Sequence, residues 1–359
     1  MRVQTSAQAV KYLREPAFFT LALLVWACLL NGCGSKDPYE HYARPYIETS
    51  STTTESWQQV NSRGALPPET ANAGWERHLI TDILQLGPWP PGSEDNRATL
   101  DSAWAGFTAF EGTRIAIGGV DSALNQSGRL QDAEANLKRA ISRFHQHFPN
   151  ATIPNVDFSY TGFNYSTYPT DDLLLIGCEF FIGAHHPAVL GLPPNIYPRY
   201  MQERMVPEHL AGDAMRGWLL VHFQDRYPQQ SRLADELLYW GKVLFITRCL
   251  TPEIPAHDLL DFTAAEWDWI RAHEMQVWME LRKEEFLYTS KRMDIQRWVA
   301  DAPFTKAGDV PQDSPDRLGW YMGLRWVEDF MQRHPEMTLQ ELMDKQEVLP
   351  FLQAYRPNT

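Results

Sequence analysis

The stretch from residue 172 to residue 249 constrains the fold most, because it predicts a strand followed by two helices. Residues 172–177 read Asp-Leu-Leu-Leu-Ile-Gly, an apolar run that is typical of a buried strand. A helix is expected from Pro207 to about residue 223, since proline is favoured at the first helical position. A second helix is expected over about 231–249, where apolar side chains share one face: Leu233, Leu237, Trp240 and Leu244.

A zinc peptidase holds its metal within elements that follow one another in this same order, a strand and then two helices. Such an enzyme needs two His at positions i and i+4 of one helix, a Glu beside the first His, and a third ligand from a later helix. Here residues 212–216 read Gly-Asp-Ala-Met-Arg, so the ligands are absent. His273-Glu274 begins a similar motif, but Val277 stands where the second His is required. We therefore predict neither a metal nor another cofactor.

The N-terminus predicts a lipoprotein signal peptide over residues 1–32. Basic residues precede an apolar run of 14 residues at 17–30, interrupted only by Thr20. This run is shorter than the roughly 20 residues of a membrane span, but it suits the apolar region of a signal peptide. It ends at Leu-Asn-Gly-Cys over 30–33, a lipobox-like sequence that permits cleavage before a cysteine. We expect Cys33 to take a diacylglycerol and to anchor the chain to a membrane of the cell envelope, facing the periplasm or the cell surface.

Residues 33–70 are expected to form an acylated flexible tether. They are poor in aliphatic side chains and include a Ser/Thr-rich run at 49–54. At about 3.3 Å per residue, an extended tether of this length would reach on the order of 100 Å. The folded part is then predicted to be a single domain over residues 71–359.

The net charge limits the class of partner that can be expected, and the cysteine content limits the possible disulfides. Removal of residues 1–32 takes away three basic residues and one acidic residue, which changes the formal net charge from −13 to −15. Such a charge repels nucleic acid, so a nucleic-acid partner is not expected. In the folded domain only Cys178 and Cys249 remain, and an envelope location permits a disulfide as well as two buried thiols.

The fold class predicted for residues 71–359 is α+β, predominantly helical with a small mixed sheet. Capping boxes at Thr263 and Thr338 predict two helix starts, the second being that of the final helix. A polar, proline-containing loop is expected over residues 301–319, and long structured loops are commonly functional. The other expected elements are helices at 75–86, 130–148 and 319–333 and strands at 114–117 and 155–160.

Three kinds of chemistry stay open from the residues alone. Asp213, Asp235 and Glu236 could supply an acid/base pair, although carboxylates on helices are usually solvated. Arg317 and Lys306 could bind an anionic partner or hydrogen-bond the carbonyls of their own loop. The 13 tryptophans could stack on sugars, although those at helical spacing are expected in the core.

The loop and its surroundings resemble the gliding-motility lipoprotein GldB family. The resemblance is carried by Asp-Ala-Pro-Phe-Thr-Lys at 301–306, Ser-Pro-Asp-Arg-Leu-Gly-Trp at 314–320 and Gly-Lys-Val-Leu-Phe at 241–245. It implies a domain remotely similar to zincins, with a degenerate core. In that comparison Gly212 and Arg216 stand at the two histidine positions, Asp213 replaces the Glu, and Trp240 stands at the third ligand.

The resemblance also implies a function. That family is associated with gliding over surfaces and with the linked envelope machinery for protein secretion. We therefore expect a lipid-anchored, non-catalytic envelope protein that contacts other gliding and secretion proteins. The alternatives are a divergent envelope peptidase or amidase and a glycan-binding module. The candidate functional residues are Asp213, Arg216, Lys242, Asp301, Lys306, Ser314 and Arg317.

Overall fold

The computed structural model describes residues 38–39, 41–43, 53–55, 74–229 and 231–358. The predicted signal peptide and Cys33 lie outside these residues. Among the helices that are described, none is both long and apolar enough to cross a membrane.

The domain is predominantly helical and contains one small mixed sheet, which confirms the predicted α+β class. Strands β1 (Thr53–Glu55), β2 (Asn155–Ser159), β3 (Thr167–Pro169) and β4 (Leu173–Gly177) lie in the order β1-β2-β4-β3. The β1–β2 and β2–β4 pairs are parallel, and the β3–β4 pair is antiparallel. Every residue of β4 is buried, which explains its unbroken apolar sequence.

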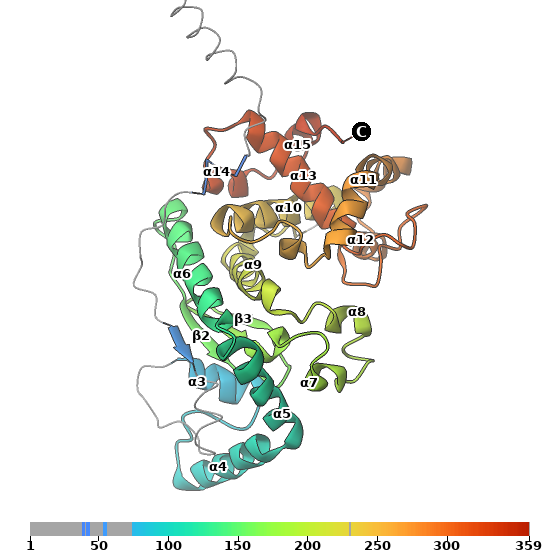
Figure 1. Ribbon diagram of the computed structural model, residues 1–359. Coiled ribbons are helices and arrows are strands. Elements are labelled where there is room, and N and C mark those ends of the chain that lie inside the picture. The colour runs from blue at the N-terminus through green and yellow to red at the C-terminus, as the bar shows by residue number, and fades with distance from the viewer. Residues whose placement is uncertain (1–37, 40, 44–52, 56–73, 230, 359) are drawn as a thin grey trace, which may run out of the picture. The chain divides into compact units, whose positions relative to one another are not determined.

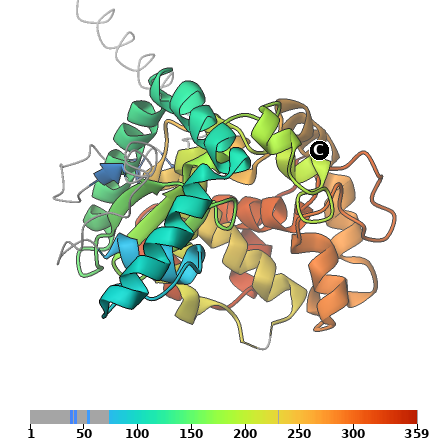
Figure 2. The same ribbon diagram turned by 90° about the horizontal axis from the view of Figure 1, so that it is seen from below.

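The helices fall into two groups along the chain. The first group comprises α3 (Trp75–Arg77), α4 (Glu94–Ala109), α5 (Glu111–Val120), α6 (Arg129–His147), α7 (Pro187–Leu190), α8 (Arg199–Gln202) and α9 (Leu210–His222). The second comprises α10 (Leu233–Leu250), α11 (Ala264–Leu281), α12 (Arg292–Val299), α13 (Leu318–Arg333), α14 (Leu339–Asp344) and α15 (Leu349–Ala354). In Figures 1 and 2 the sheet lies among the first group, and the second group packs around α10 and α13.

Helix α9 links the two groups, because it contacts α6, β3 and β4 of the first group and α10 of the second. Its buried face includes Leu210, Ala214, Met215 and Trp218. The helix also carries Asp213 and Arg216, so its packing places these two charged side chains where the groups meet.

Two glycines allow α10 and α13 to touch through their backbones. A Cβ atom at Gly323 would lie 1.8 Å from the carbonyl oxygen of Leu237, and one at Gly241 would lie 2.1 Å from the carbonyl carbon of Gly323. Any larger side chain would force the helices apart. This contact brings Arg317, just before α13, toward α9 and the core.

The strand predicted at 114–117 is wrong, since these residues lie inside helix α5. Ile115 and Ile117 before a Gly-Gly pair imitate a strand and a turn. The buried positions Thr113, Ala116, Ile117 and Val120 instead follow helical spacing. Gly119 is needed for packing, because a Cβ atom there would lie 2.7 Å from the His186 ring.

Two further differences concern short elements. Strand β3 lies between the predicted strands at 155–160 and 172–177, where no strand was expected. Its last residue is Pro169, and proline is tolerated on an edge strand. The capping box at Thr338 does start a helix, but α14 ends at Asp344 and a further helix, α15, follows. The helices and strands expected at 130–148, 155–160, 172–177, 231–249 and 319–333 are confirmed to within a few residues.

The start predicted for the domain, residue 71, is too late. Tyr39 and Tyr42 lie within the predicted tether, yet they are buried in the core. Strand β1, also within it, pairs with β2. The segment has few aliphatic side chains, but these two tyrosines supply apolar surface that packs into the core. The remaining residues of 33–70 lie outside the described part of the chain.

Candidate functional site

A buried cluster of ion pairs joins three separate segments. Arg216 of α9 donates from Nη2 to Asp213 Oδ1 at 2.7 Å and to Asp261 Oδ2 at 3.0 Å. Arg317 donates from Nη1 to the same Asp261 oxygen at 2.8 Å. Asp261 therefore lies between two guanidinium groups, one from α9 and one from the start of α13.

Both guanidinium groups also hold the backbone before Asp261. Arg216 Nη1 donates to the carbonyl of Leu259 at 2.6 Å, and Arg317 Nη2 donates to that of Leu260 at 2.8 Å. Asp261 and Arg317 have φ angles of 53° and 48°, a left-handed conformation that side chains disfavour. The ion pairs and hydrogen bonds stabilise this backbone against its strain.

A second set of contacts ties the two ends of the 301–319 loop together. Asp316 accepts from Arg204 Nη2 at 2.7 Å, from Arg317 Nε at 3.2 Å and from the backbone N–H of Ala302 at 3.0 Å. Asp301 lies 3.4 Å from Arg204 and 3.3 Å from Arg317. The loop is thus fixed to the domain by charges at its beginning and at its end.

The pKa values of the two central carboxyl groups, Asp213 and Asp261, are shifted in opposite directions. Burial and the neighbouring charge of Asp261 raise the pKa of Asp213 well above its usual value. Burial alone would also raise the pKa of Asp261, but Arg216 and Arg317 hold it well below its usual value. Burial thus favours the neutral form of Asp213, whereas the two guanidinium groups favour the ionised form of Asp261.

The residues that the predicted zincin alignment places at the metal-ligand positions do not fit a zinc ion. Arg216 presents a cation that repels a metal, and it is already held by two carboxyl groups. Gly212 has no side chain and packs toward Leu259, where a Cβ atom would lie at 3.2 Å. In the described part of the chain, no three His, Cys, Asp or Glu side chains are grouped as metal ligands would be.

The aromatic candidates belong to the same packed region. Trp240, which the predicted zincin alignment places at the third ligand, stacks on Trp320 with 3.9 Å between ring centroids. The Arg317 guanidinium lies 5.0 Å from the Trp320 ring. Trp320 and Trp326 are buried, so their faces are not offered to a sugar.

Glu236 and Lys242, both on α10, lie outside the cluster. Glu236 is buried and accepts from Ser231 Oγ at 2.6 Å and from Arg292 at 2.5 Å. Lys242 donates to the carbonyls of Met343 at 3.3 Å and of Lys345 at 2.8 Å, where α14 ends. Burial lowers the pKa of Lys242 to about 8. These contacts give both side chains structural partners.

The remaining candidates, Ser314 and Lys306, differ in their exposure to solvent. Ser314 is buried in the loop, and its hydroxyl has no hydrogen-bond partner among the described residues. Lys306 is exposed and lies over the Phe304 ring at 5.2 Å. The guanidinium group of Arg317 donates to the carboxylates of Asp261 and Asp316 and to the carbonyl of Leu260, so its described hydrogen bonds in its own loop are made to a carboxylate and not to the loop carbonyls that the sequence suggested.

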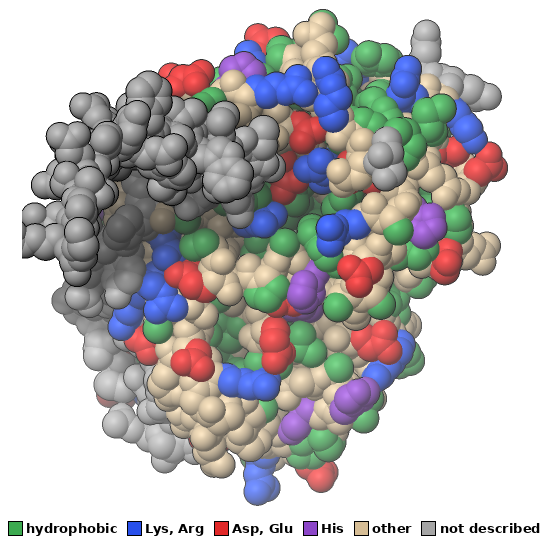
Figure 3. All heavy atoms as spheres, turned by 45° about the horizontal axis from the view of Figure 1, so that its top comes forward, with side chains coloured by type: hydrophobic (Ala, Val, Ile, Leu, Met, Phe, Trp, Pro, Cys, Tyr) green, Lys and Arg blue, Asp and Glu red, His purple; other side chains and the backbone are tan. Residues whose placement is uncertain are grey.

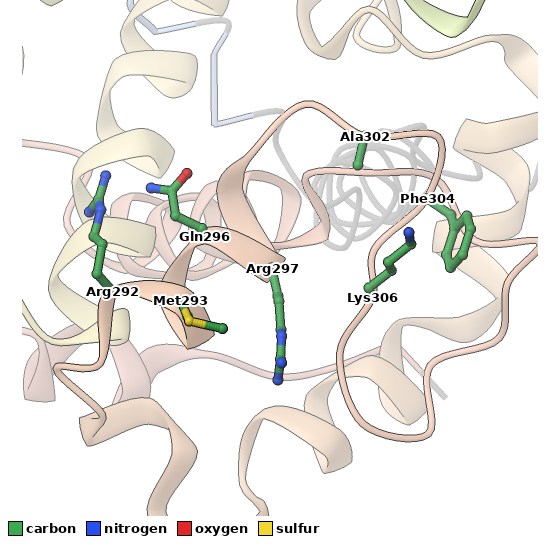
Figure 4. A pocket seen from close by; sticks show the side chains of 7 residues that line it. All are labelled: Arg292, Met293, Gln296, Arg297, Ala302, Phe304 and Lys306. Carbon is green, nitrogen blue, oxygen red and sulfur yellow. The ribbon is translucent and has the colours of Figure 1, made fainter. Parts of the chain in front are cut away.

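Lys306 lines an open pocket between the loop and α12, with a volume of about 340 Å³. Figure 4 shows its lining residues, which are Arg292, Met293, Gln296, Arg297, Ala302, Phe304 and Lys306. Three of them are cationic and none is acidic. The alternate residues 302, 304 and 306 face this pocket, whereas Pro303 lines a second pocket of about 330 Å³ on the other side, beside Arg204 and Asp261.

Sequence reasoning brought Asp213, Arg216, Asp301 and Arg317 together as candidates, and the structure places them in one cluster. It missed Asp261, the residue that links them. A lone acid inside the apolar run Leu259-Leu260-Asp261-Phe262 was the available signal. Cys178 and Cys249 are both buried thiols.

The comparisons with known proteins cover the cluster and the loop. The family model described as gliding motility protein GldB matches residues 99–357. No curated protein and no solved structure matches the chain. Because the match extends over more than half of the 359 residues, the chain belongs to the family of the gliding motility protein GldB.

Proposed function

We propose that this protein is a lipid-anchored component of the cell envelope that serves gliding motility and the linked secretion machinery through protein contacts, without catalysing a reaction. Its helical domain is a degenerate zincin-like core. The observation that carries the proposal is that the guanidinium group of Arg216, the residue that we align with a metal ligand, is held by Asp213 and Asp261. The cluster acts as a lock that fixes the 301–319 loop.

The anchor is the acylated Cys33, and the lipobox-like sequence before it supports this assignment. Fractionation of cells that carry Cys33→Ala tests it. The variant is expected to leave the membrane fraction, because the acyl chains supply the membrane affinity. Undiminished membrane association would refute the anchor. Stoichiometric zinc in the purified wild-type chain, found by elemental analysis, would refute the degenerate core.

The contact surface is the pocket lined by Lys306. Arg292 pairs with Glu236, and Arg297 pairs with Asp294 at 3.3 Å, whereas no described carboxylate pairs with Lys306. Beside these cations lie the apolar side chains of Met293, which is 75% exposed, and Phe304. Cations beside an apolar wall complement an acidic segment of a partner protein that also carries an apolar side chain.

Crosslinking tests this surface. A photoreactive benzoylphenylalanine at position 304 is expected to capture a partner in living cells, and Lys306→Glu should abolish the capture by placing a like charge against the partner. Arg271→Glu makes the same change of charge at an exposed position of α11 outside the pocket, and it should leave the capture unchanged. Equal capture in the Lys306→Glu and Arg271→Glu chains would refute this contact surface.

One observation favours a second candidate, a divergent envelope peptidase or amidase. Asp213 is 19% exposed, and its raised pKa is the property that a general acid needs. Such an enzyme would lose a hydrolytic activity in Asp213→Asn without losing its fold. The proposed non-catalytic role predicts no such loss.

A further inference from the structure

The chain returns to the domain only a few residues after Cys33. Tyr39 and Tyr42, six and nine residues beyond that cysteine, are 4% and 3% exposed. In Figure 1 residues 38–39 and 41–43, drawn in blue, lie beside α14. A segment that the sequence predicts as a free tether is therefore fixed near its beginning.

Tyr39 is held by contacts of three kinds. Its hydroxyl donates to Glu328 Oε1 of α13. Its ring lies 4.8 Å from the ring of Phe245, and the Arg248 guanidinium of α10 lies 3.9 Å from the Tyr39 centroid. An aromatic contact, a cation–π contact and a hydrogen bond each stabilise the docked ring.

Tyr42 is held at the next site. Its hydroxyl donates to the carbonyl of Met337 at 2.6 Å, and its own carbonyl accepts from His147 Nε2 at 2.9 Å. His147 is the last residue of α6, and Met337 precedes α14. The two tyrosines, which we call the tyrosine clamp, thus bind where the C-terminal parts of α6, α10 and α13 lie close together.

We infer that the tyrosine clamp shortens the membrane tether from the whole of residues 33–70 to the six peptide units between Cys33 and Tyr39, and so holds this face of the domain at the lipid surface. At about 3.3–3.6 Å per residue, Tyr39 lies no more than about 20 Å from the acylated cysteine, against on the order of 100 Å for a free tether. The inference rests on the proposed function, because it requires the Cys33 anchor.

The clamp restricts the partners that the protein can meet. A domain on a free tether of this length could contact proteins far from its membrane. A clamped domain contacts proteins that lie at the same membrane, with the ends of α6, α10 and α13 next to the lipid head groups. Strand β1 docks the chain a second time at residues 53–55, so even without the clamp the tether would end well before residue 70.

Two insertions of equal length test the clamp. A flexible 20-residue Gly/Ser segment is placed after Ser35, upstream of the clamp, or after Thr49, downstream of the clamp and upstream of β1. The full-length acylated chains are reconstituted into vesicles that contain a lipid-linked acceptor dye. The donor dye is attached to Met279→Cys, an exposed position on α11. Energy transfer then reports the distance between the domain and the membrane.

The upstream insertion should move the domain away from the membrane by on the order of 20 Å, the root-mean-square span of such a linker. The downstream insertion should leave the distance unchanged. Equal increases for both insertions, as a free tether requires, would overturn the inference, and so would no increase for either. A third chain with Tyr39→Ala and Tyr42→Ala should lengthen the distance without any insertion, whereas Tyr288→Ala at an exposed site should not.

The two proposals fail in different ways. If the Cys33→Ala chain stays in the membrane fraction, the anchor of the proposed function fails. If wild-type chains are anchored but both insertions act equally, the clamp alone fails.

Discussion

Replacing Arg317 by Met removes a buried cation that forms ion pairs with Asp301 and Asp316, near the two ends of the 301–319 loop. The side chain is 2% exposed and donates to Asp261 at 2.8 Å, to the carbonyl of Leu260 at 2.8 Å and to Asp316 at 3.2 Å. Met has a similar length and no charge, so it leaves two buried carboxylates with fewer partners. We expect this variant to be strongly destabilised.

The size of the loss in unfolding free energy depends on the ion-pair partners that the two carboxylates keep in the variant. Removing one partner of a buried ion pair destabilises a protein by about 3–5 kcal/mol. Asp261 keeps Arg216 and Asp316 keeps Arg204, at 3.0 and 2.7 Å, which places the expected loss near the lower end, about 3 kcal/mol. Arg317→Lys should lose less, because an ammonium keeps the charge but lacks the planar fork that reaches all three acceptors.

Urea unfolding of the purified full-length chain in detergent, followed by tryptophan fluorescence, measures this loss. Lys306→Met serves as the matched control, because it removes a cation of the same loop at an exposed position, where changes are usually within about 0.5 kcal/mol. Limited proteolysis should also cut residues 301–319 faster in Arg317→Met. A loss of less than about 1 kcal/mol with an unchanged urea dependence would refute the idea that this ion pair fixes the loop.

Two further predictions concern the core. Gly323→Ala should lower the melting temperature, because the added Cβ would lie 1.8 Å from the Leu237 carbonyl oxygen. This overpacking outweighs the gain of about 1 kcal/mol in helix propensity. An unchanged melting temperature would contradict the close contact of α10 and α13. Burial raises the pKa of Glu179 from 4.5 to about 7, so its contribution to stability is present below pH 4.5 and is lost as the pH rises through 7. Glu179→Gln does not titrate, and its stability relative to wild type should improve by about 3 kcal/mol between pH 4.5 and 8. Equal differences in urea midpoint at the two pH values would refute the buried titration.

Local signals in the sequence predicted much of the fold. The capping boxes at Thr263 and Thr338 start helices as expected, because side chain and backbone satisfy each other within four residues. The apolar run of β4 likewise predicted a buried strand, since a strand that is buried on both faces needs no polar residue. The strand expected at 114–117 failed because four residues are too few to separate the two spacings; the buried positions Thr113, Ala116, Ile117 and Val120 follow helical spacing only when the whole of α5 is considered.

The site was predictable only in part, because its geometry depends on long-range contacts. The 301–319 loop and Asp213 were recognised through the family resemblance. Asp261 is 45 residues from Arg216 and 56 from Arg317, so no spacing in the sequence links them. The tyrosine clamp could not be predicted for the same reason, because Tyr39 and its partner Glu328 are 289 residues apart in the sequence. Such pairs follow from the packing of α9, α10 and α13.

The spreading of a deletion strain complemented with Asp213→Asn tests the central claim, that the cluster is a structural lock in a non-catalytic protein. Asn is isosteric with the neutral carboxyl that burial favours at this position, and its oxygen can still accept from Arg216. The account predicts that the variant accumulates normally and restores spreading at the wild-type rate. Normal accumulation with abolished spreading would contradict it and would favour Asp213 as a catalytic acid.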